Sequence, residues 1–173
     1  MKAQIAGLVL GLCASSPLAA QQMLFPSVDT VRSHAAARGP TELIMPSADY
    51  PDPYIEAQAQ GYYYLAILVG CEGMVGCDQV EFSASFTTDD PSLRFANSWN
   101  SENRIGTAYI EAGTEDEILL SYTIVIDPGI SVGAFTETLD IWVDTMDAFS
   151  NQLYGYDQGS RGGGSSGGAV SGK

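Results

Sequence analysis

The chain has 173 residues, with 7 Lys and Arg against 21 Asp and Glu, a formal net charge of −14. This length suits one domain, and 45 % hydrophobic with only 16 % charged residues is enough for a packed core rather than a disordered chain. The acidic balance argues against binding to nucleic acid or to anionic lipid, because both depend on clustered Lys and Arg.

The N-terminal residues 1–20 have the build of a secretory signal peptide. Lys2 precedes an apolar run, and small residues lead up to Ala20, after which we expect cleavage. Cys13 lies in the apolar run, but Leu12 stands where a lipoprotein has Gly or Ala, so lipidation ranks second. We therefore expect an exported protein with no membrane insertion once the leader is removed.

The C-terminal residues 158–173 are dominated by Gly and Ser. These residues bury little surface and lose the most entropy on ordering, so the segment is expected to be a flexible tail. Whether this tail is native or an addition is not decided by composition. The predicted domain is residues 21–157.

The first half of the domain starts with a helix. Ser27–Arg38 has a Ser at its start, an Asp in its first turn and Gly-Pro after its end, which are helix start and stop signals. Thr41–Met45 is a candidate edge strand, and the proline-rich stretch Pro46–Pro53 indicates a loop. The alternating or branched segments Tyr54–Gln58, Tyr62–Val69 and Gln79–Phe86 predict antiparallel strands joined as a meander.

Two cysteines lie in the loop between the last two of these strands. Cys71 and Cys77 are separated by five residues, and an even pair in an exported protein indicates a disulfide. A two-thiolate metal site and a redox pair are the alternatives. The first would need more ligands, and His34 is the single histidine; the second usually has two intervening residues.

The second half predicts a helix, two strands and a long helix. Asp90 is the candidate N-cap, Pro91 the first helical residue, and the helix runs to about Asn100. Thr107–Glu111 and Ile118–Ile126 are strand candidates. The last helix, Val132–Leu153, has one apolar stripe of Phe135, Leu139, Trp142, Met146, Phe149 and Leu153.

These elements follow the order α–β–β–β–α–β–β–α, which predicts an α+β domain with an antiparallel sheet flanked by helices.

The segment Leu93–Tyr109 has a pattern of an aromatic–Asn pair, an Arg a few residues later and a strand containing Tyr. Its characteristic residues are Trp99, Asn100, Arg104 and Tyr109. With the loop and long helix around it, this segment resembles the YbjN family, named as bacterial sensory transduction regulators, over about Val28–Leu153. Ile105 departs from the pattern, since an aromatic residue is usual there.

The resemblance implies a fold similar to type III secretion chaperones, which often dimerise. The family name implies regulation, and no catalytic residue can be carried over because the family supplies none. Since the family is bacterial, the resemblance also implies that the exported protein lies in the periplasm, with secretion as the alternative. The expected partner is an unknown protein or peptide, or a second copy of the chain.

Trp99, Asn100 and Arg104 could form a binding site for a ligand or peptide. The structural alternative, which we favour, places Trp99 in the core under the long helix, Asn100 as the cap at the C-terminal end of its own helix, and Arg104 in a pair with an acid.

Tyr62, Tyr63 and Tyr64 form the most prominent aromatic group. In a strand, Tyr62 and Tyr64 share one face and Tyr63 points to the other. One face is expected in the core, whereas the other is either an exposed binding surface or packed across strands.

Carboxylate clusters at Asp89-Asp90 and 115–117 could bind Ca²⁺ or hydrolyse glycosides, but the first has a simpler explanation as a helix cap and the second as a solvated hairpin tip. His34 is interpreted as a surface histidine. We predict no catalytic residue, metal or cofactor, and a non-enzymatic binding, chaperone-like or regulatory protein. The alternative is a small secreted hydrolase or carbohydrate-binding protein that uses acids and tyrosines.

Overall fold

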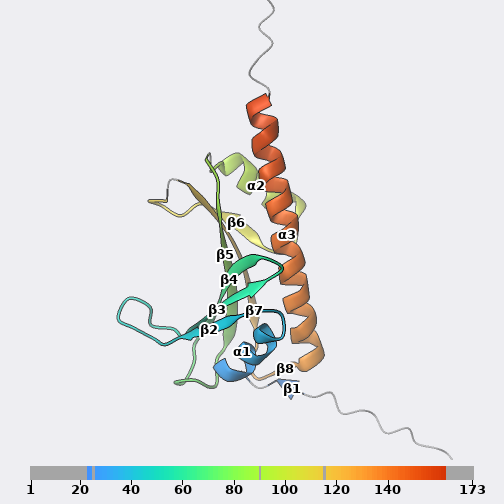
Figure 1. The fold of residues 1–173 in the computed structure, drawn as a ribbon. Helices are drawn as coiled ribbons and strands as arrows, with labels where there is room; N and C mark the ends of the chain where they lie inside the picture. Colours follow the sequence, from blue (N-terminus) through green and yellow to red (C-terminus); the bar gives the residue numbers. More distant parts are fainter. Residues whose placement is uncertain (1–22, 25, 90, 115, 163–173) are drawn as a thin grey trace, which may run out of the picture.

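The structure is a computed structural model that describes residues 23–162 apart from 25, 90 and 115. In this part of the chain it has three helices, α1 (Val28–Ala36), α2 (Leu93–Glu102) and α3 (Val132–Gly162). The main sheet is antiparallel, with the strand order β2–β3–β4–β5–β7–β6 (Figure 1). Its strands are β2 (Thr41–Ile44), β3 (Tyr54–Ala59), β4 (Tyr62–Val69), β5 (Gln79–Thr87), β6 (Thr107–Tyr109) and β7 (Glu117–Val125). The predicted α+β class is confirmed.

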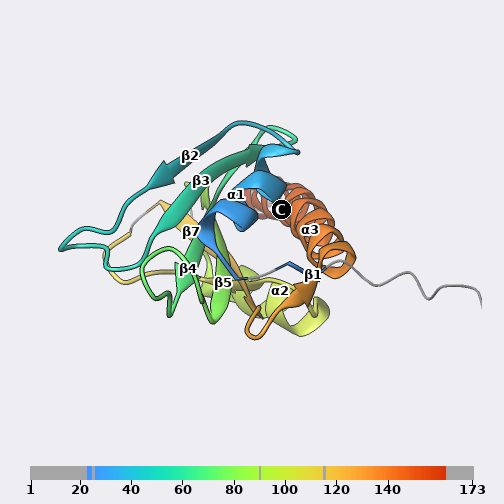
Figure 2. The same ribbon diagram turned by 90° about the horizontal axis from the view of Figure 1, so that it is seen from below.

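The helices lie on one side of the sheet, which curves around α1 and α3 (Figure 2). We call this side the inner face. Alternate residues of the strands point to it, as period-two alternation predicts, and most of those on β3, β4 and β5 are buried. On β4 and β5 they are Tyr64, Ala66, Leu68, Val80, Phe82, Ala84 and Phe86.

The long helix α3 covers the inner face with its apolar stripe. All six predicted stripe residues, from Phe135 to Leu153, are at most 1 % exposed. Phe149 gathers three rings around it, because Phe86 of β5 and Phe95 and Trp99 of α2 all lie within 5.3 Å between ring centroids. The helix extends to Gly162 and so includes the first residues of the segment predicted as a tail; residues 163–173 lie outside the described part.

Four strands, not three, lie between α1 and α2, because the candidate edge strand pairs with β3 as β2. A second sheet of two short strands, β1 (Met23–Leu24) and β8 (Ile130–Ser131), was not predicted. Two residues are too few to show any periodicity.

The predicted start of α2 is wrong. Its N-cap is Ser92, whose Oγ accepts a hydrogen bond from the Phe95 amide at 3.5 Å. Asp90, the predicted cap, lies outside the described residues. Both residues are good N-caps, and Pro91 before Ser92 can remain in the extended conformation that precedes a helix.

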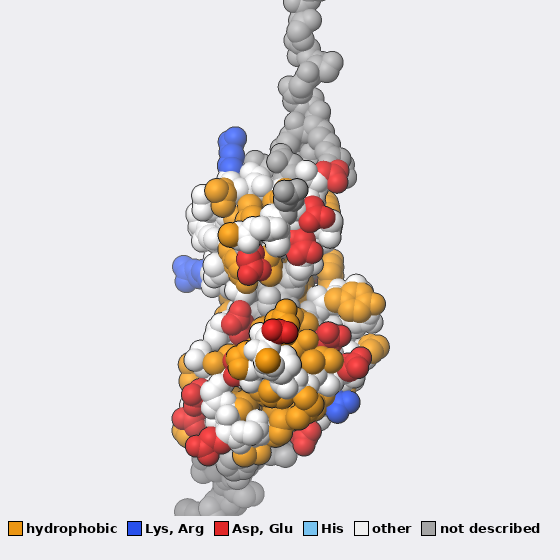
Figure 3. All heavy atoms as spheres, turned by 90° about the vertical axis from the view of Figure 1, so that its left-hand side faces the viewer, with side chains coloured by type: hydrophobic (Ala, Val, Ile, Leu, Met, Phe, Trp, Pro, Cys, Tyr) orange, Lys and Arg blue, Asp and Glu red, His pale blue; other side chains and the backbone are white. Residues whose placement is uncertain are grey.

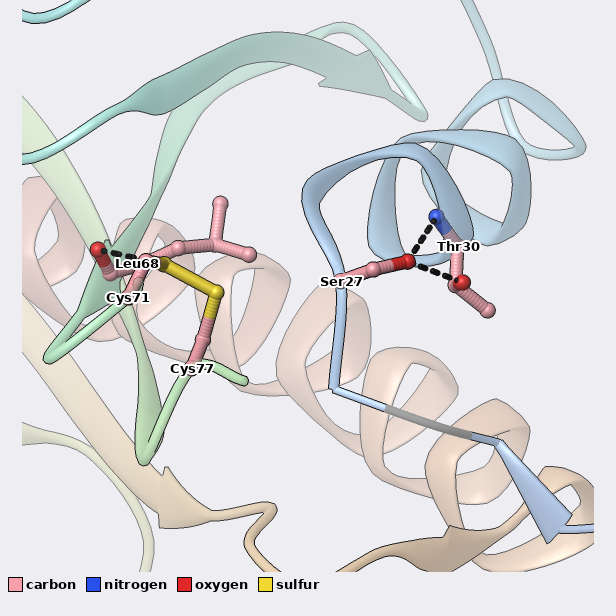
Figure 4. Close-up of a disulfide and its surroundings, with 5 residues drawn as sticks. All are labelled: Ser27, Thr30, Leu68, Cys71 and Cys77. Carbon is pink, nitrogen blue, oxygen red and sulfur yellow. Dashed lines mark hydrogen bonds between the residues drawn. A yellow bond between two sulfur atoms is a disulfide. The ribbon is translucent and has the colours of Figure 1, made fainter. Parts of the chain in front are cut away.

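A disulfide joins Cys71 and Cys77 in the loop after β4 (Figure 4). This loop holds the start of α1: the amide of Val28 donates to the Met74 carbonyl at 3.1 Å, and the amide of Gly76 donates to the Pro26 carbonyl at 2.8 Å. The Ser27 hydroxyl then caps α1 through the Thr30 amide. The cross-link therefore fixes a loop that positions a helix.

The predicted leader, residues 1–20, falls outside the described residues. Among the helices that are described, none combines the length and apolarity that crossing a bilayer requires.

Candidate functional site

Trp99 lies in the core, 1 % exposed, where α2 meets α3. Its ring meets that of Phe149 edge to face at 4.9 Å between centroids. Its Nε1 donates a hydrogen bond to the Gly106 carbonyl at 2.8 Å, which satisfies the polar atom of a buried indole. Trp99 thus joins α2, α3 and the turn before β6.

Asn100 does not cap its helix, contrary to the structural interpretation above. Its Nδ2 donates to the Ala108 carbonyl at 2.9 Å and its Oδ1 accepts from the Ala108 amide at 2.8 Å. The side chain therefore pairs with the outer edge of β6 much as another strand would. The cap is Asn103, whose amide and Nδ2 both donate to the Trp99 carbonyl.

Arg104 is exposed and pairs with no acid among the described residues, whose ion pair within 4.0 Å is Arg38 with Asp140. The expected acid partner is therefore not seen. Arg104 lines an open hollow of about 340 Å³ between the end of α2 and α3, together with Trp99, Ile105, Asp144 and Thr145.

Tyr109 lies on the opposite side of the sheet from Trp99. On β6 its neighbour Ala108 points inward and is buried, while Tyr109 is partly exposed. Burial raises the pKa of the Tyr109 hydroxyl, and nearby Glu81 adds to the rise, while a hydrogen bond with Ser83 opposes it. The motif is thus split between the two faces of the sheet.

The three tyrosines of β4 are split in the same way. Tyr64 is 2 % exposed and meets Trp142 edge to face at 6.4 Å, and burial raises its pKa to about 12. Tyr62 is half-buried and donates a hydrogen bond to Asp147 of α3 at 3.0 Å. Tyr63 points to the other side and is 74 % exposed.

The side of the sheet away from the helices is here called the outer face. The registers place its side chains in rows across the strands. One row is Glu42, Glu56, Leu65, Ser83 and Ser121, and the next is Ile44, Tyr54, Ile67, Glu81 and Thr123. Tyr63, Leu119, Tyr109 and Val125 also belong to this face. Figure 3 shows it as a broad hydrophobic region with carboxylates among and around it.

The charges of the outer face have one sign. The six strands of the main sheet contain four charged residues, Glu42, Glu56, Glu81 and Glu117, and no Lys or Arg. The alternation places all four on the outer face, and Glu42 lies directly opposite Glu56 across β2 and β3. In Figure 3 the basic side chains stand at the outline of the molecule.

Glu56 lies at the centre of the hollows of this face. Three of them, of about 230, 210 and 270 Å³, are each lined by Glu56. Tyr63 lines the hollows of about 230 and 270 Å³, and Leu65 lines those of about 210 and 270 Å³. The hollow of about 210 Å³ is also lined by Tyr50, Tyr54 and Ile67. Each hollow is smaller than a typical ligand pocket of about 300–1,000 Å³, so it suits a side chain rather than a whole cofactor.

Residues 27–154 match the YbjN family, described as "Putative bacterial sensory transduction regulator". The chain belongs to the YbjN family. No curated protein and no solved structure matches, so the likeness of this YbjN chain to type III secretion chaperones stays a prediction.

The YbjN family is described by regulation rather than by a reaction, and no enzyme family matches the chain. Among the described residues, no group of three His, Cys, Asp or Glu is placed to hold a metal ion. His34 of this YbjN chain lies on α1 with its ring edge-on to Phe135 at 5.5 Å, and burial, followed by the charge of Arg38, lowers its pKa.

The sequence analysis missed two residues that are important in the structure of this YbjN chain, Glu56 and Gly106. Glu56 is one of 21 acidic residues, and nothing in the local sequence distinguishes it. Its position on the outer face results from the pairing of β3 with β2 and β4. Gly106 was overlooked although it follows Arg104 closely. Its φ is +78°, and a Cβ there would lie 2.9 Å from a Leu120 methyl carbon. An isolated Gly before a short strand was the available signal.

Proposed function

We propose that this YbjN chain is an exported, non-enzymatic binding protein of a regulatory or chaperone-like kind, whose outer face is the surface that receives a protein partner. The observation that carries the proposal is that face itself. The sheet is covered by helices on one side only, and the other side exposes apolar and aromatic side chains across several strands.

Strand β4 shows the exposed apolar surface of the outer face most clearly. Its sequence YYYLAILV is a continuous run of apolar and aromatic residues, which is typical of a strand buried on both faces. Here Tyr63 is exposed and Leu65, Ile67 and Val69 are only half-buried. A large apolar surface of this kind marks an interaction site in a folded protein.

Two observations support export. Residues 1–20 have the composition of a leader, and the Cys71–Cys77 disulfide is the kind of cross-link that persists in an oxidising compartment.

The test is photo-crosslinking in the living cell. Tyr63 is replaced by benzoylphenylalanine in the full chain, with Tyr154 of α3, 44 % exposed, replaced as the matched control on the helical side. We expect a discrete adduct from position 63 and none from position 154. Adducts from 154 alone, or none from 63, would contradict the proposal.

Tyrosines beside carboxylates also suit a carbohydrate, the second candidate, because Tyr63 and Glu56 line the same two hollows. Carbohydrate binding would be independent of ionic strength and would give no protein adduct. Nothing in the described geometry favours the hydrolase alternative.

A further inference from the structure

The outer face restricts the chemistry of what can cover it. Its strands carry four glutamates and no Lys or Arg, and the arginines whose side chains are described, Arg32, Arg38, Arg94 and Arg104, all lie outside the six strands. Glu42 and Glu56 lie directly opposite each other on neighbouring strands, and like charges in such a pair destabilise a sheet. The face therefore combines apolar contact area with an uncompensated negative charge.

A second copy of the chain fits this face poorly. A symmetric dimer through it would bring Glu42, Glu56 and Glu81 of one protomer against the same acids of its partner. Like charges brought together at an interface cost binding free energy, and the chain as a whole has a net charge of −14. Charge complementarity favours a cationic occupant instead.

The hollows around Glu56 have the size and lining that a basic side chain requires. Three side-chain-sized depressions surround Glu56, and two of them are flanked by Tyr63. An aromatic ring beside a carboxylate suits a Lys or Arg side chain, whose aliphatic stem packs on the ring while its charge meets the acid. Leu65, Ile67 and Tyr54 offer apolar contact next to it.

We propose that the outer face binds a cationic, amphipathic segment of a partner protein, with Glu42 and Glu56 receiving its Lys or Arg side chains while Tyr63, Leu65 and Ile67 contact its apolar ones. This rests on the proposed function and names the class of partner for the same face. The binding combines hydrophobic contact with charge pairing, so its affinity falls as ionic strength rises.

The probes are three fluorescein-labelled peptides that alternate Leu with Lys, with Ser or with Glu, titrated into the exported full chain by fluorescence anisotropy. The Lys peptide is expected to bind more tightly than the Ser peptide, and the Glu peptide least tightly. In the Glu42→Gln/Glu56→Gln variant the Lys peptide should lose roughly three- to tenfold in affinity, with the Ser peptide unchanged. Glu137→Gln on α3, an exposed acid on the helical side, is the matched control and should change nothing.

A Tyr63→Ser variant tests the location without disturbing the core, because this side chain is 74 % exposed. It should weaken the Lys peptide and the Ser peptide alike. If both peptides bind equally and Tyr63→Ser weakens both, the cationic partner is overturned while the binding face stands. If Tyr63→Ser changes neither, or if the Lys peptide does not bind, the assignment of this segment to this face is overturned.

Analytical ultracentrifugation of the chain without peptide tests whether a second copy covers the outer face. We expect no self-association through the outer face. A dimer that Tyr63→Ser dissociates would show that a second copy covers this face, and it would overturn the proposal.

Discussion

Asn100 holds both backbone polar groups of Ala108, donating to its carbonyl at 2.9 Å and accepting from its amide at 2.8 Å. An asparagine on α2 thereby completes the hydrogen bonding of β6, the short strand that ends the main sheet. At this residue the family motif therefore joins α2 to the edge of the main sheet.

Asn100→Ala should destabilise the protein by about 2–3 kcal/mol, because it leaves both polar groups of Ala108, a residue 3 % exposed, without their partner. Asn151→Ala is the control, since the Asn151 side chain donates to Asp147 on the exposed surface of α3. Urea denaturation followed by circular dichroism measures both. Equal loss in the two variants would contradict the role given to Asn100.

Gly106→Ala should cost about 1–3 kcal/mol, because φ is +78° and the new Cβ would crowd Leu120 and Thr145. Gly155→Ala, in the interior of α3 where the added Cβ would point into open space, should instead be neutral or stabilising by up to about 1 kcal/mol. Thermal unfolding of the two variants side by side tests the difference in sign. A Gly106→Ala protein as stable as the parent would refute the crowding.

The two tryptophans should respond differently to Phe. Trp99 donates to the Gly106 carbonyl, whereas Nε1 of Trp142 has no hydrogen-bond partner in the described part of the chain. Both indoles are buried, so the loss of volume is similar. Trp99→Phe should therefore cost about 1–2 kcal/mol more than Trp142→Phe. The reverse order in chemical denaturation would contradict the assigned hydrogen bond.

His34 should make the protein less stable in mild acid. Its pKa in the folded state is lowered from 6.5 by burial and then by Arg38, so the unfolded chain binds a proton more readily. The stabilisation is fully present above pH 6.5 and is lost as the pH falls through the folded pKa. His34→Gln should lose this part of the pH dependence.

Since His34 is the single histidine, its ring proton gives one NMR titration curve. The midpoint should lie below 6.5, and a midpoint above that value would contradict the effect of burial.

The elements that the sequence predicts well are those with strong local periodicity. The alternation of β5 and the 4–3–4–3–4 spacing of the α3 stripe identify their buried sides, because one face of each must meet the core. The Cys71–Cys77 cross-link followed from the count and spacing of cysteines.

The candidate site was less accessible to sequence reasoning. The role of Asn100 depends on a partner eight residues away across a turn, and the place of Glu56 depends on its pairing with two other strands. The apolar run of β4 fits a strand covered on both sides, and only the arrangement of the helices shows that one side is open.

Amide chemical shifts, mapped in the full chain as the peptide of alternating Leu and Lys is added, would show whether the outer face is the binding surface. We expect the shifted amides to lie in β3, β4 and β5, around Glu56, Tyr63 and Leu65. Shifts gathered instead around Arg104 and Asp144, at the hollow between α2 and α3, would contradict it and move the binding site to the helical side.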